Sequence, residues 1–310
     1  MATTQRIEAF APASCANLNC GFDILGFALE TPGDTVIIQK AQHKNVIIKK
    51  ITGDAGKLPL NPDKNTASVA VKYLLKKLNI KCGIEITIHK NMPLESGLGS
   101  SAASSVAAIY ALNNLLELGL SKMELIQYAM MGETVASGEA HADNIAPSML
   151  GGFTLIRSYT PLDIIQLPTP KDLYYTIVHP NISINTKEAR SILRHNVALK
   201  DVITQTANLG GLISGLYLND YALIGRSLND VIIEPVRALL MPYFNEVKDV
   251  ALNSGALGFG ISGSGPSLFT LNKSKDSALV VAERMINVFN KYRIKCMSYS
   301  AKINTTGAVS

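Results

Sequence analysis

The sequence predicts an α+β protein built from two domains. Its 310 residues are roughly twice the usual length of a single domain. Apolar residues make up 47% of the chain and charged residues 17%, as in ordinary globular proteins rather than disordered ones. The predicted strands and helices follow one another in an order that suits an α+β arrangement.

The first part of the chain shows strand and helix patterns in turn. Residues 35–51 carry two β-branched runs separated by a polar segment, which predicts a hairpin. The apolar spacing in residues 66–78 predicts an amphipathic helix. In residues 83–93 isoleucines alternate with polar residues, so a half-buried strand is expected there, ending at Pro93.

Two helices and a strand complete the first predicted domain. An alanine-rich run at residues 101–119 predicts a helix that is closed by Gly119. Ser121 and Glu124 have the S-x-x-E spacing of a capping box, which opens another helix. Residues 151–156 have the pattern of a strand.

A Pro-rich stretch at residues 161–172 marks the expected division into domains 1–160 and 161–310. The second domain shows strand, helix, strand, helix and strand patterns in an order that suits α+β. They lie at 173–179, then several helices, then 258–271, 277–292 and a last strand.

Charge and cysteine content exclude several classes of protein. The net charge is +5, and no block of five or more like charges occurs, so a nucleic-acid partner is not indicated. Neither a signal sequence nor an apolar run of about 18 residues is present, which predicts a cytoplasmic protein without a membrane partner. Cys15, Cys20, Cys82 and Cys296 form no C-x-x-C pair and are expected to be free thiols.

The stretch "PLESGLGSSAA" (93–103) places a glycine loop directly before a helix. A helix N-terminus offers unpaired amides and a partial positive charge, so it stabilises an anion. Gly97 and Gly99 allow close backbone approach, and Ser100 and Ser101 add hydroxyl donors. These features predict a phosphate-binding loop; a tight turn with glycines for packing is the structural alternative.

Two better-known phosphate motifs do not account for this loop. No G-x-x-x-x-G-K-[ST] string occurs, so a Walker A loop is excluded. "GLGSSA" matches the dinucleotide fingerprint, but the acidic residue about 20 positions further on is missing. The preceding strand also alternates, whereas a buried parallel strand is continuously apolar.

Glu133 falls on the apolar side of its predicted helix, following Ile126, Ala129 and Met130 at helical spacing. Burying a carboxylate is costly unless a cation meets it, and Mg²⁺ on nucleotide phosphates would do so. The alternative is a glutamate at the helix end that reaches solvent.

Further polar residues cluster in non-helical stretches. "GEAHADNIAP" brings together His141, Asp143 and Asn144, which suits either a metal site or an Asx-turn before Pro147. Three more candidates in the second half are each compatible with a cap, a surface charge or a turn: Thr186 and Arg190 in "NTKEAR", Arg237 after a proline, and the glycine-rich "GISGSGPS" at 260–267.

Taken together, these stretches resemble the GHMP small-molecule kinases over essentially the whole chain, and most closely the branch acting on L-homoserine. "APASCANLNCGFDILGFAL" (11–29) is similar to the N-terminal substrate motif, 93–103 to the nucleotide loop, and "GISGSGPSLF" (260–269) to the C-terminal glycine motif. "HADNIAP" (141–147) and "TKEAR" (186–190) resemble that branch in particular.

The resemblance implies a first domain like the second domain of ribosomal protein S5 and a ferredoxin-like second domain. It also implies transfer of the γ-phosphoryl group of ATP to the side-chain hydroxyl of L-homoserine, giving O-phospho-L-homoserine for threonine synthesis. The implied ATP loop consists of Pro93, Leu94, Glu95, Ser96, Gly97, Leu98, Gly99, Ser100, Ser101, Ala102 and Ala103. Mg²⁺ would be held by Ser100 and Glu133, and a homodimer is expected.

Charge favours an amino-acid substrate, because a zwitterion needs an anion for its ammonium and forked donors for its carboxylate. Asp23 beside Asn17 supplies the first, and Arg190 and Arg237 supply the second. By resemblance, His141 and Asn144 line the same pocket. The expected catalytic residues are Glu133, Asn144, Thr186 and Arg190.

No general base is evident, since Asn144 stands where some relatives have an acid. Positioning and charge neutralisation supply most of the catalysis in phosphoryl transfer, so a late proton loss is expected. Departures from the usual pattern occur at Cys15, Asn19, Cys20 and Glu139. The alternatives are a GHMP kinase for another small hydroxylated metabolite and an inactive GHMP-fold binding protein.

Overall fold

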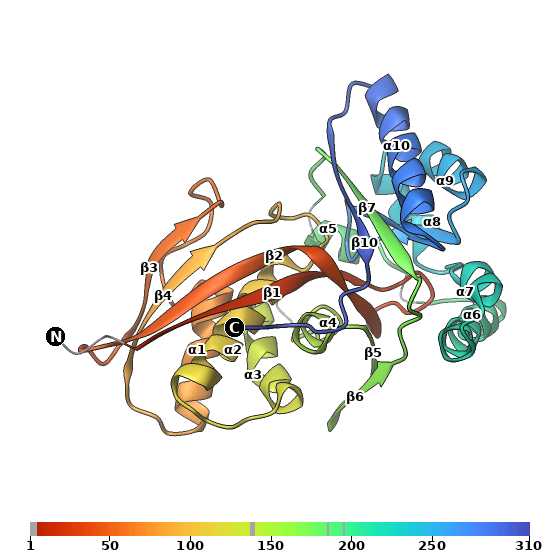
Figure 1. Cartoon of the computed structure of the whole chain (residues 1–310). Helices are drawn as coiled ribbons and strands as arrows, with labels where there is room; N and C mark the ends of the chain where they lie inside the picture. The colour runs from red at the N-terminus through yellow and green to blue at the C-terminus, as the bar shows by residue number, and fades with distance from the viewer. Residues whose placement is uncertain (1–4, 137–139, 185, 195) are drawn as a thin grey trace.

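The structure is a computed structural model that describes residues 5–136, 140–184, 186–194 and 196–310. Two sheets confirm the α+β class (Figure 1). The first sheet has the order β3-β4-β2-β5-β6, with β1 paired to β2. Its strands are β1 (Arg6–Ala16), β2 (Leu25–Ala41), β3 (Val46–Thr52), β4 (Gly83–His89), β5 (Phe153–Tyr159) and β6 (Leu162–Leu167).

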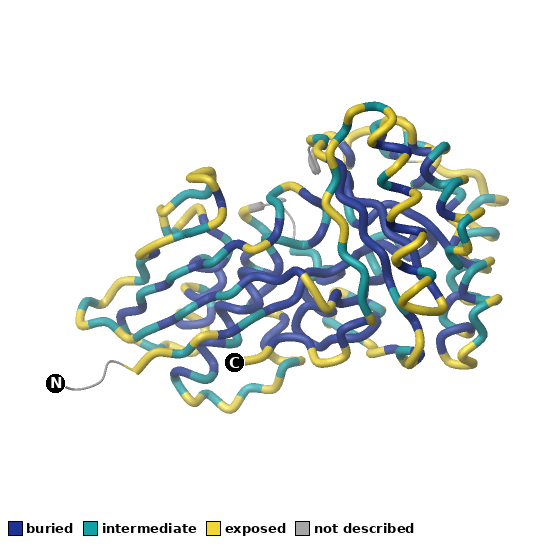
Figure 2. The backbone as a smooth tube through the Cα atoms, turned by 45° about the horizontal axis from the view of Figure 1, so that its top comes forward, coloured by how far each residue is buried: buried dark blue, intermediate teal, exposed yellow. Residues whose placement is uncertain are grey.

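Four helices cover one face of the first sheet, and the interior between them is buried (Figures 1 and 2). They are α1 (Thr66–Lys77), α2 (Ser100–Leu115), α3 (Lys122–Ala136) and α4 (Ile145–Leu150). The central helix is α2, which packs against β1, β2, α1 and α3. Its sequence is rich in alanine and serine, so the neighbouring elements can approach it closely from several sides.

The prediction of a hairpin over residues 35–51 is wrong: both strands exist, but they do not pair with each other. β2 pairs with β4 in antiparallel fashion and β3 pairs with β4 in parallel, so β4 lies between them. The turn that joins β2 to β3 passes over the start of β4 at Gly83. A Cβ on Gly83 would lie 1.6 Å from the His43 carbonyl oxygen, so only glycine permits this crossing.

The second sheet has the order β10-β7-β9-β8, which is the 4-1-3-2 order of a ferredoxin-like βαββαβ unit. Its strands are β7 (Tyr174–Pro180), β8 (Gly258–Ile261), β9 (Leu268–Asn272) and β10 (Cys296–Lys302). The predicted single strand at 258–271 is therefore two strands, separated by the second glycine loop, residues 262–267. Here Gly263 and Gly265 have φ of 57° and 81°, so an extended strand cannot continue through them.

The helices of the second half pack around this sheet and beside it (Figure 1). They are α5 (Thr186–Ser191), α6 (Leu199–Leu218), α7 (Tyr221–Ser227), α8 (Glu234–Arg237), a short 3₁₀ turn (Ala238–Leu240), α9 (Phe244–Asn253) and α10 (Lys275–Lys291). Both α9 and α10 pack against the sheet and each other, whereas α6 and α7 form a separate pair. In the described part of the chain, no helix combines the length and apolarity needed to cross a membrane.

The two sheets are in direct contact. Buried Tyr175 of β7 donates a hydrogen bond to the Thr31 carbonyl oxygen of β2 at 2.9 Å, and its hydroxyl accepts from the Glu30 amide at 3.1 Å. The C-terminal segment returns to the first sheet, where Phe10 and Val309 exchange two backbone hydrogen bonds. β6 lies within the Pro-rich stretch 161–172, and the division at residue 160 stays a prediction.

Candidate active site

The first glycine loop connects β4 to α2 and depends on glycine at two positions. Gly97 has φ of 75° and Gly99, the residue before the helix, has φ of 66°. A Cβ on Gly97 would lie 2.3 Å from the Ser262 carbonyl oxygen, and one on Gly99 would lie 2.4 Å from Ser14 Oγ. No side chain in the described residues caps the N-terminus of α2. The amides of this first turn are thus left for an anion.

The second glycine loop supports the first one from the other half of the chain. Ser262 Oγ donates a hydrogen bond to the Gly97 carbonyl oxygen at 2.8 Å, and the Ser267 amide donates to the Ser96 carbonyl oxygen at 3.2 Å. Because these bonds hold carbonyl groups of the loop, they fix its backbone without occupying its amides. This contact brings the first glycine loop, within residues 93–103, and the second one, residues 262–267, together.

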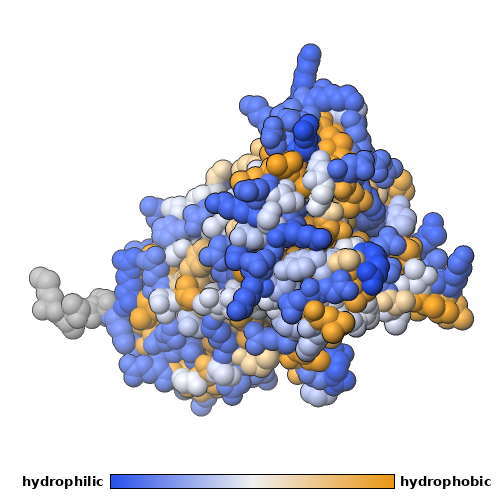
Figure 3. Space-filling view, turned by 45° about the vertical axis from the view of Figure 1, so that its right-hand side comes forward, coloured by the Kyte–Doolittle hydropathy of each residue, from blue (hydrophilic) through white to orange (hydrophobic). Residues whose placement is uncertain are grey.

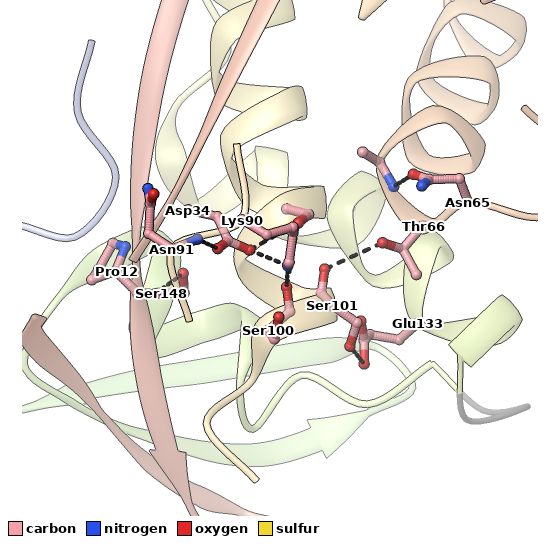
Figure 4. A network of polar contacts seen from close by, with 12 residues as sticks. Pro12, Asp34, Asn65, Thr66, Lys90, Asn91, Ser100, Ser101, Glu133 and Ser148 are labelled. Carbon is pink, nitrogen blue, oxygen red and sulfur yellow. Dashed lines mark hydrogen bonds and ion pairs between the residues drawn. The ribbon is translucent and has the colours of Figure 1, made fainter. Parts of the chain in front are cut away.

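A buried ion pair, which sequence reasoning missed, anchors the start of α2 (Figure 4). Lys90 Nζ pairs with Asp34 and donates to the Ser100 carbonyl oxygen at 2.7 Å and to Ser104 Oγ at 2.8 Å. Asp34 also accepts a hydrogen bond from the Asn91 amide at 3.0 Å. Burial lowers the pKa of Lys90, and the Asp34 carboxylate opposes that shift. Lys90 and Asp34 are 56 residues apart in the sequence, so no local sequence pattern indicates that they pair.

Glu133 of α3 lies opposite the first residues of α2 (Figure 4). Ser101 Oγ donates to its Oε2 at 3.1 Å, and its Oε1 is buried. The pKa of Glu133 is raised to about 7, chiefly by burial; the Ser101 hydrogen bond opposes this shift, and the negative charge of Asp143 adds to it. The carboxyl group is therefore not at the solvent-facing helix end that was the alternative interpretation.

The same corner suits a hard divalent cation. Ser100 Oγ is buried, and within residues 5–136, 140–184, 186–194 and 196–310 it has no hydrogen-bond partner. Next to it, the Glu133 carboxyl group is destabilised as an anion by its burial. Mg²⁺ prefers oxygen ligands and takes only one or two protein carboxylates. These two side chains therefore fit the expected metal site.

At the other end, Asp23 and Arg190 face each other. The guanidinium of Arg190 donates to both carboxylate oxygens of Asp23, at 3.2 and 2.8 Å. Asn17 Oδ1 accepts from the Asp23 amide at 3.0 Å, which fixes the backbone of that residue. The two charges that were expected to bind opposite ends of a zwitterion are thus adjacent and bound to each other.

Arg237 lies beside this pair and is buried. It donates to the Gly263 carbonyl oxygen at 2.9 Å and to the Ala189 carbonyl oxygen at 3.2 Å, and its guanidinium carbon lies 4.8 Å from the centre of the Phe22 ring. Burial lowers the pKa of Arg237, and the negative charge of Asp23 opposes this. These contacts hold its cationic plane rigidly beside Asp23.

The stretch 141–144 completes the wall between the two ends. Ser14 Oγ donates to Asn144 Oδ1 at 2.8 Å. Asp143 is buried and accepts from the Asn144 amide at 3.0 Å. Its burial, together with the negative charge of Asp23, raises the pKa of Asp143 to about 6. The sequence identified this cluster, but it gave no reason to select Asp143 as a member of the site.

All these parts line one cavity of about 700 Å³. Of the predicted residues it is lined by Asn17, Asp23, Leu94, Glu95, Ser96, Gly97, Gly99, Ser100, Ser101, Glu133, His141, Asn144, Arg190 and Arg237. Leu98, Ala102 and Ala103 instead pack in the core, and Pro93 is not part of the lining. The side chain of Thr186 and the whole of Glu139 lie outside the described residues.

The cavity also has a part that sequence reasoning did not find. Residues 57–59 and 64–66, with Lys90 and Val135, extend it beyond the glycine loop. The segment "NPDKNT" (61–66) had a turn composition and a helix-capping Asn65, but nothing in it indicates a ligand. Only the fold brings it next to the loop.

Comparisons with known proteins agree over both halves of the chain. A model of the N-terminal domain of GHMP kinases matches residues 65–152, and one of their C-terminal domain matches residues 212–291. The chain is 48% identical to homoserine kinase of Chlorobium phaeovibrioides, over 97% of this chain and 98% of that protein. It is 50% identical to homoserine kinase of Chloroherpeton thalassium, over 93% of each.

A solved structure agrees with these sequence similarities. The crystal structure of homoserine kinase from Cytophaga hutchinsonii matches with a TM-score of 0.96 at 48% identity, covering 100% of this chain and 98% of that one. Mevalonate kinase of L. major, in complex with R-mevalonate, matches with a TM-score of 0.72 at 14% identity, which shows a shared fold alone.

Proposed function

Because the chain belongs to the homoserine kinases of the GHMP kinase family, we propose that it transfers the γ-phosphoryl group of ATP to the side-chain hydroxyl of L-homoserine. The product would be O-phospho-L-homoserine, used in threonine synthesis. One observation carries the proposal: the glycine loop before the uncapped N-terminus of α2 and the Asp23–Arg190 pair line the same cavity.

The substrate pocket has the charges that an amino acid needs. Asp23 offers an anion for an ammonium group, and Arg190 and Arg237 offer forked donors for a carboxylate. When a zwitterion binds, the Asp23–Arg190 ion pair separates. Asp23 then pairs with the ammonium group and the arginines with the carboxylate, so every charge still has a partner. A mevalonate-like acid has no ammonium group, so it would leave Asp23 without a cation.

The nucleotide end would act through its backbone. The free amides around Gly97 and Gly99 would bind phosphate oxygens, while Lys90 holds the first turn of α2 in place through the Ser100 carbonyl oxygen. Ser100 and Glu133 would hold Mg²⁺, which when bound neutralises charge on the phosphates. Most of the rate enhancement would then come from positioning and charge neutralisation.

No side chain needs to accept the hydroxyl proton in this scheme. Asn144 stands at the wall of the cavity, but an amide is not a base, and its oxygen already accepts from Ser14. We therefore expect Asn144 to orient the substrate hydroxyl, and the proton to leave late in the reaction.

The function is tested by supplying ATP and Mg²⁺ with L-homoserine, mevalonate, shikimate or galactose in turn. We expect ADP release to be fastest with L-homoserine. Faster release with another member of the panel would favour a GHMP kinase for a different metabolite. Tight ATP binding with no turnover of any of them would favour an inactive binding protein.

We also propose a cytoplasmic homodimer, and one surface supports it. α6 buries Leu212, Gly215 and Leu216, and it exposes the large apolar side chains of Leu199, Ile203, Tyr217 and Leu218. Figure 3 shows apolar side chains next to hydrophilic ones on the face that this view presents. Light scattering after gel filtration should give twice the chain mass of 33.3 kDa. The variant Ile203→Glu should have the mass of a single chain, because a charge on this apolar surface would disrupt the dimer.

A further inference from the structure

The backbone of the substrate loop, residues 17–23, is held in an uncommon conformation. Asn17, Leu18, Asn19 and Asp23 have φ of 78°, 42°, 58° and 62°. Residues other than glycine rarely adopt such angles, and they persist only where the surroundings impose them. Some contact must therefore hold this loop in its conformation. Because Asp23 lies at the end of the loop, the same contact also determines where Asp23 is placed.

Asn19 makes such a contact across the two halves of the chain. It is 5% exposed, and its Nδ2 donates to the Leu228 carbonyl oxygen at 2.9 Å and to the Phe259 carbonyl oxygen at 2.7 Å. Both hydrogens of the amide are thereby used. A Cβ on Gly260 would lie 1.7 Å from Asn19 Oδ1, so the missing side chain at 260 makes the slot that the amide fills.

The Leu228 end of this contact leads to Arg237. Two residues after Leu228, buried Asp230 accepts hydrogen bonds from the Ile233 and Glu234 amides, each at 2.9 Å. That carboxylate thus holds the two amides at the start of α8 (Glu234–Arg237), whose last residue is Arg237. Asn19 is therefore hydrogen-bonded to the segment that precedes α8, the helix that carries Arg237.

The Phe259 end leads to the same guanidinium by another route. Phe259 lies in β8, which runs into the second glycine loop. In that loop the Gly263 carbonyl oxygen accepts both from Arg237 and from Asn17 Nδ2, at 2.9 and 2.8 Å. Both carbonyls held by Asn19 are thus linked to Arg237, and Asn19 itself is four residues from Asp23.

We infer that Asn19 is a positioning residue, which sets the distance between Asp23 and Arg237 by joining the substrate loop to the second half of the chain. It touches neither substrate in this scheme. The inference rests on the proposed function, because Asp23 and Arg237 are the groups assigned there to the ammonium and the carboxylate. Asn19 is also one of the departures from the usual motif.

The direct test is Asn19→Gly, which keeps the positive φ and removes only the amide. We expect the KM for L-homoserine to rise roughly ten-fold, equivalent to about 1.4 kcal/mol, and the KM for ATP to change less than about two-fold. Asn113→Ala is the matched control. Buried Asn113 of α2 bonds the Leu120 amide and carbonyl at 3.1 and 3.3 Å, so its loss should lower Tm and leave both KM values unchanged.

A second variant disrupts the Asn19 contact from its other side. Gly260→Ala places a methyl group where the Asn19 amide lies, so it should raise the KM for L-homoserine about as much as Asn19→Gly does. In the double variant the KM should rise no further, because the amide is already gone. A Cβ at 260 also lies 2.8 Å from the Phe269 ring, which should lower Tm in both backgrounds.

Kinetics of the unmodified chain separate the two proposals. If it does not phosphorylate L-homoserine, the proposed function fails and the inference fails with it. If it does, an unchanged KM for L-homoserine in Asn19→Gly overturns the inference alone. Independent, multiplicative KM changes in the double variant, or equal changes in the KM for ATP, would overturn it as well.

Discussion

The two ends of the cavity are built in different ways. The proposed nucleotide end is built around one short stretch, residues 94–97 and 99–101, and presents main-chain amides next to two glycines. The amino-acid end is formed by side chains that come from both halves of the chain, Asp23 from the first and Arg190 and Arg237 from the second. A backbone site needs glycine and a helix start, whereas a side-chain site needs the correct placement of two domains.

The ion pairs at the two ends also differ in how far they are buried. Lys90 and Asp34 beneath the nucleotide end have side chains that are 2% and 0% exposed, whereas those of Arg190 and Asp23 are 42% and 27% exposed. Buried charges cannot lose a partner without a large cost. Half-exposed charges can exchange partners, which is what substrate binding at the amino-acid end requires.

The largest effect should come from Glu133→Gln at the nucleotide end. This variant keeps the shape and removes only the negative charge proposed to face Mg²⁺, so kcat should fall about 1000-fold while the circular dichroism spectrum is unchanged. Glu124→Gln, in the capping box of the same helix, is the control and should be near normal, because glutamine also caps. Near-normal turnover of Glu133→Gln would show that this carboxylate does not serve the metal.

Arg190→Ala should have the next largest effect, and at the other end. It removes the forked donor for the carboxylate and leaves Asp23 without its partner, so kcat/KM for L-homoserine should fall about 100-fold. The KM for ATP should hardly change. Arg157→Ala, which removes an exposed ion pair with Asp163, is the control and should leave both unchanged. Loss of ATP binding in Arg190→Ala would instead place Arg190 at the phosphates.

The contrast between the ends also explains what could be predicted from the sequence. Gly97, Gly99 and Ser100 are consecutive with the helix they precede, so the physics of a helix N-terminus identified them without a fold. Glu133 was found because a charge on an apolar helix face is conspicuous. For the amino-acid end, the charges could be named, but their meeting in one cavity could only be inferred from resemblance.

Other features depended on contacts between distant segments and could not be predicted. Lys90 looked like an ordinary strand-end lysine, because its partner Asp34 is 56 residues away. The hairpin over 35–51 was wrong for the same reason: β4, which separates its strands, comes later in the chain. Asn19 appeared only as a departure from a motif, since the carbonyls that it binds lie in the second half.

The smallest predicted effect is on stability. It is the difference in how the free energy of unfolding depends on pH between the unmodified chain and Glu133→Gln, both measured without metal. The pKa of Glu133 is about 7 in the folded chain and near 4.5 when unfolded. Between these values the folded chain holds a proton that the unfolded chain has lost, so the free energy of unfolding falls as pH rises. This fall should be about 2 kcal/mol between pH 5 and pH 7, and little more should follow above pH 8. Glu133→Gln lacks this fall, but it keeps Asp143 and Lys90, so the contributions of these two groups largely cancel in the comparison. Urea unfolding of both proteins in a chelator should therefore show the variant gaining relative stability from pH 5 to pH 7. Parallel curves would mean that the Glu133 carboxyl is solvated, and the contrast in burial between the two ends would then be wrong at its most important residue.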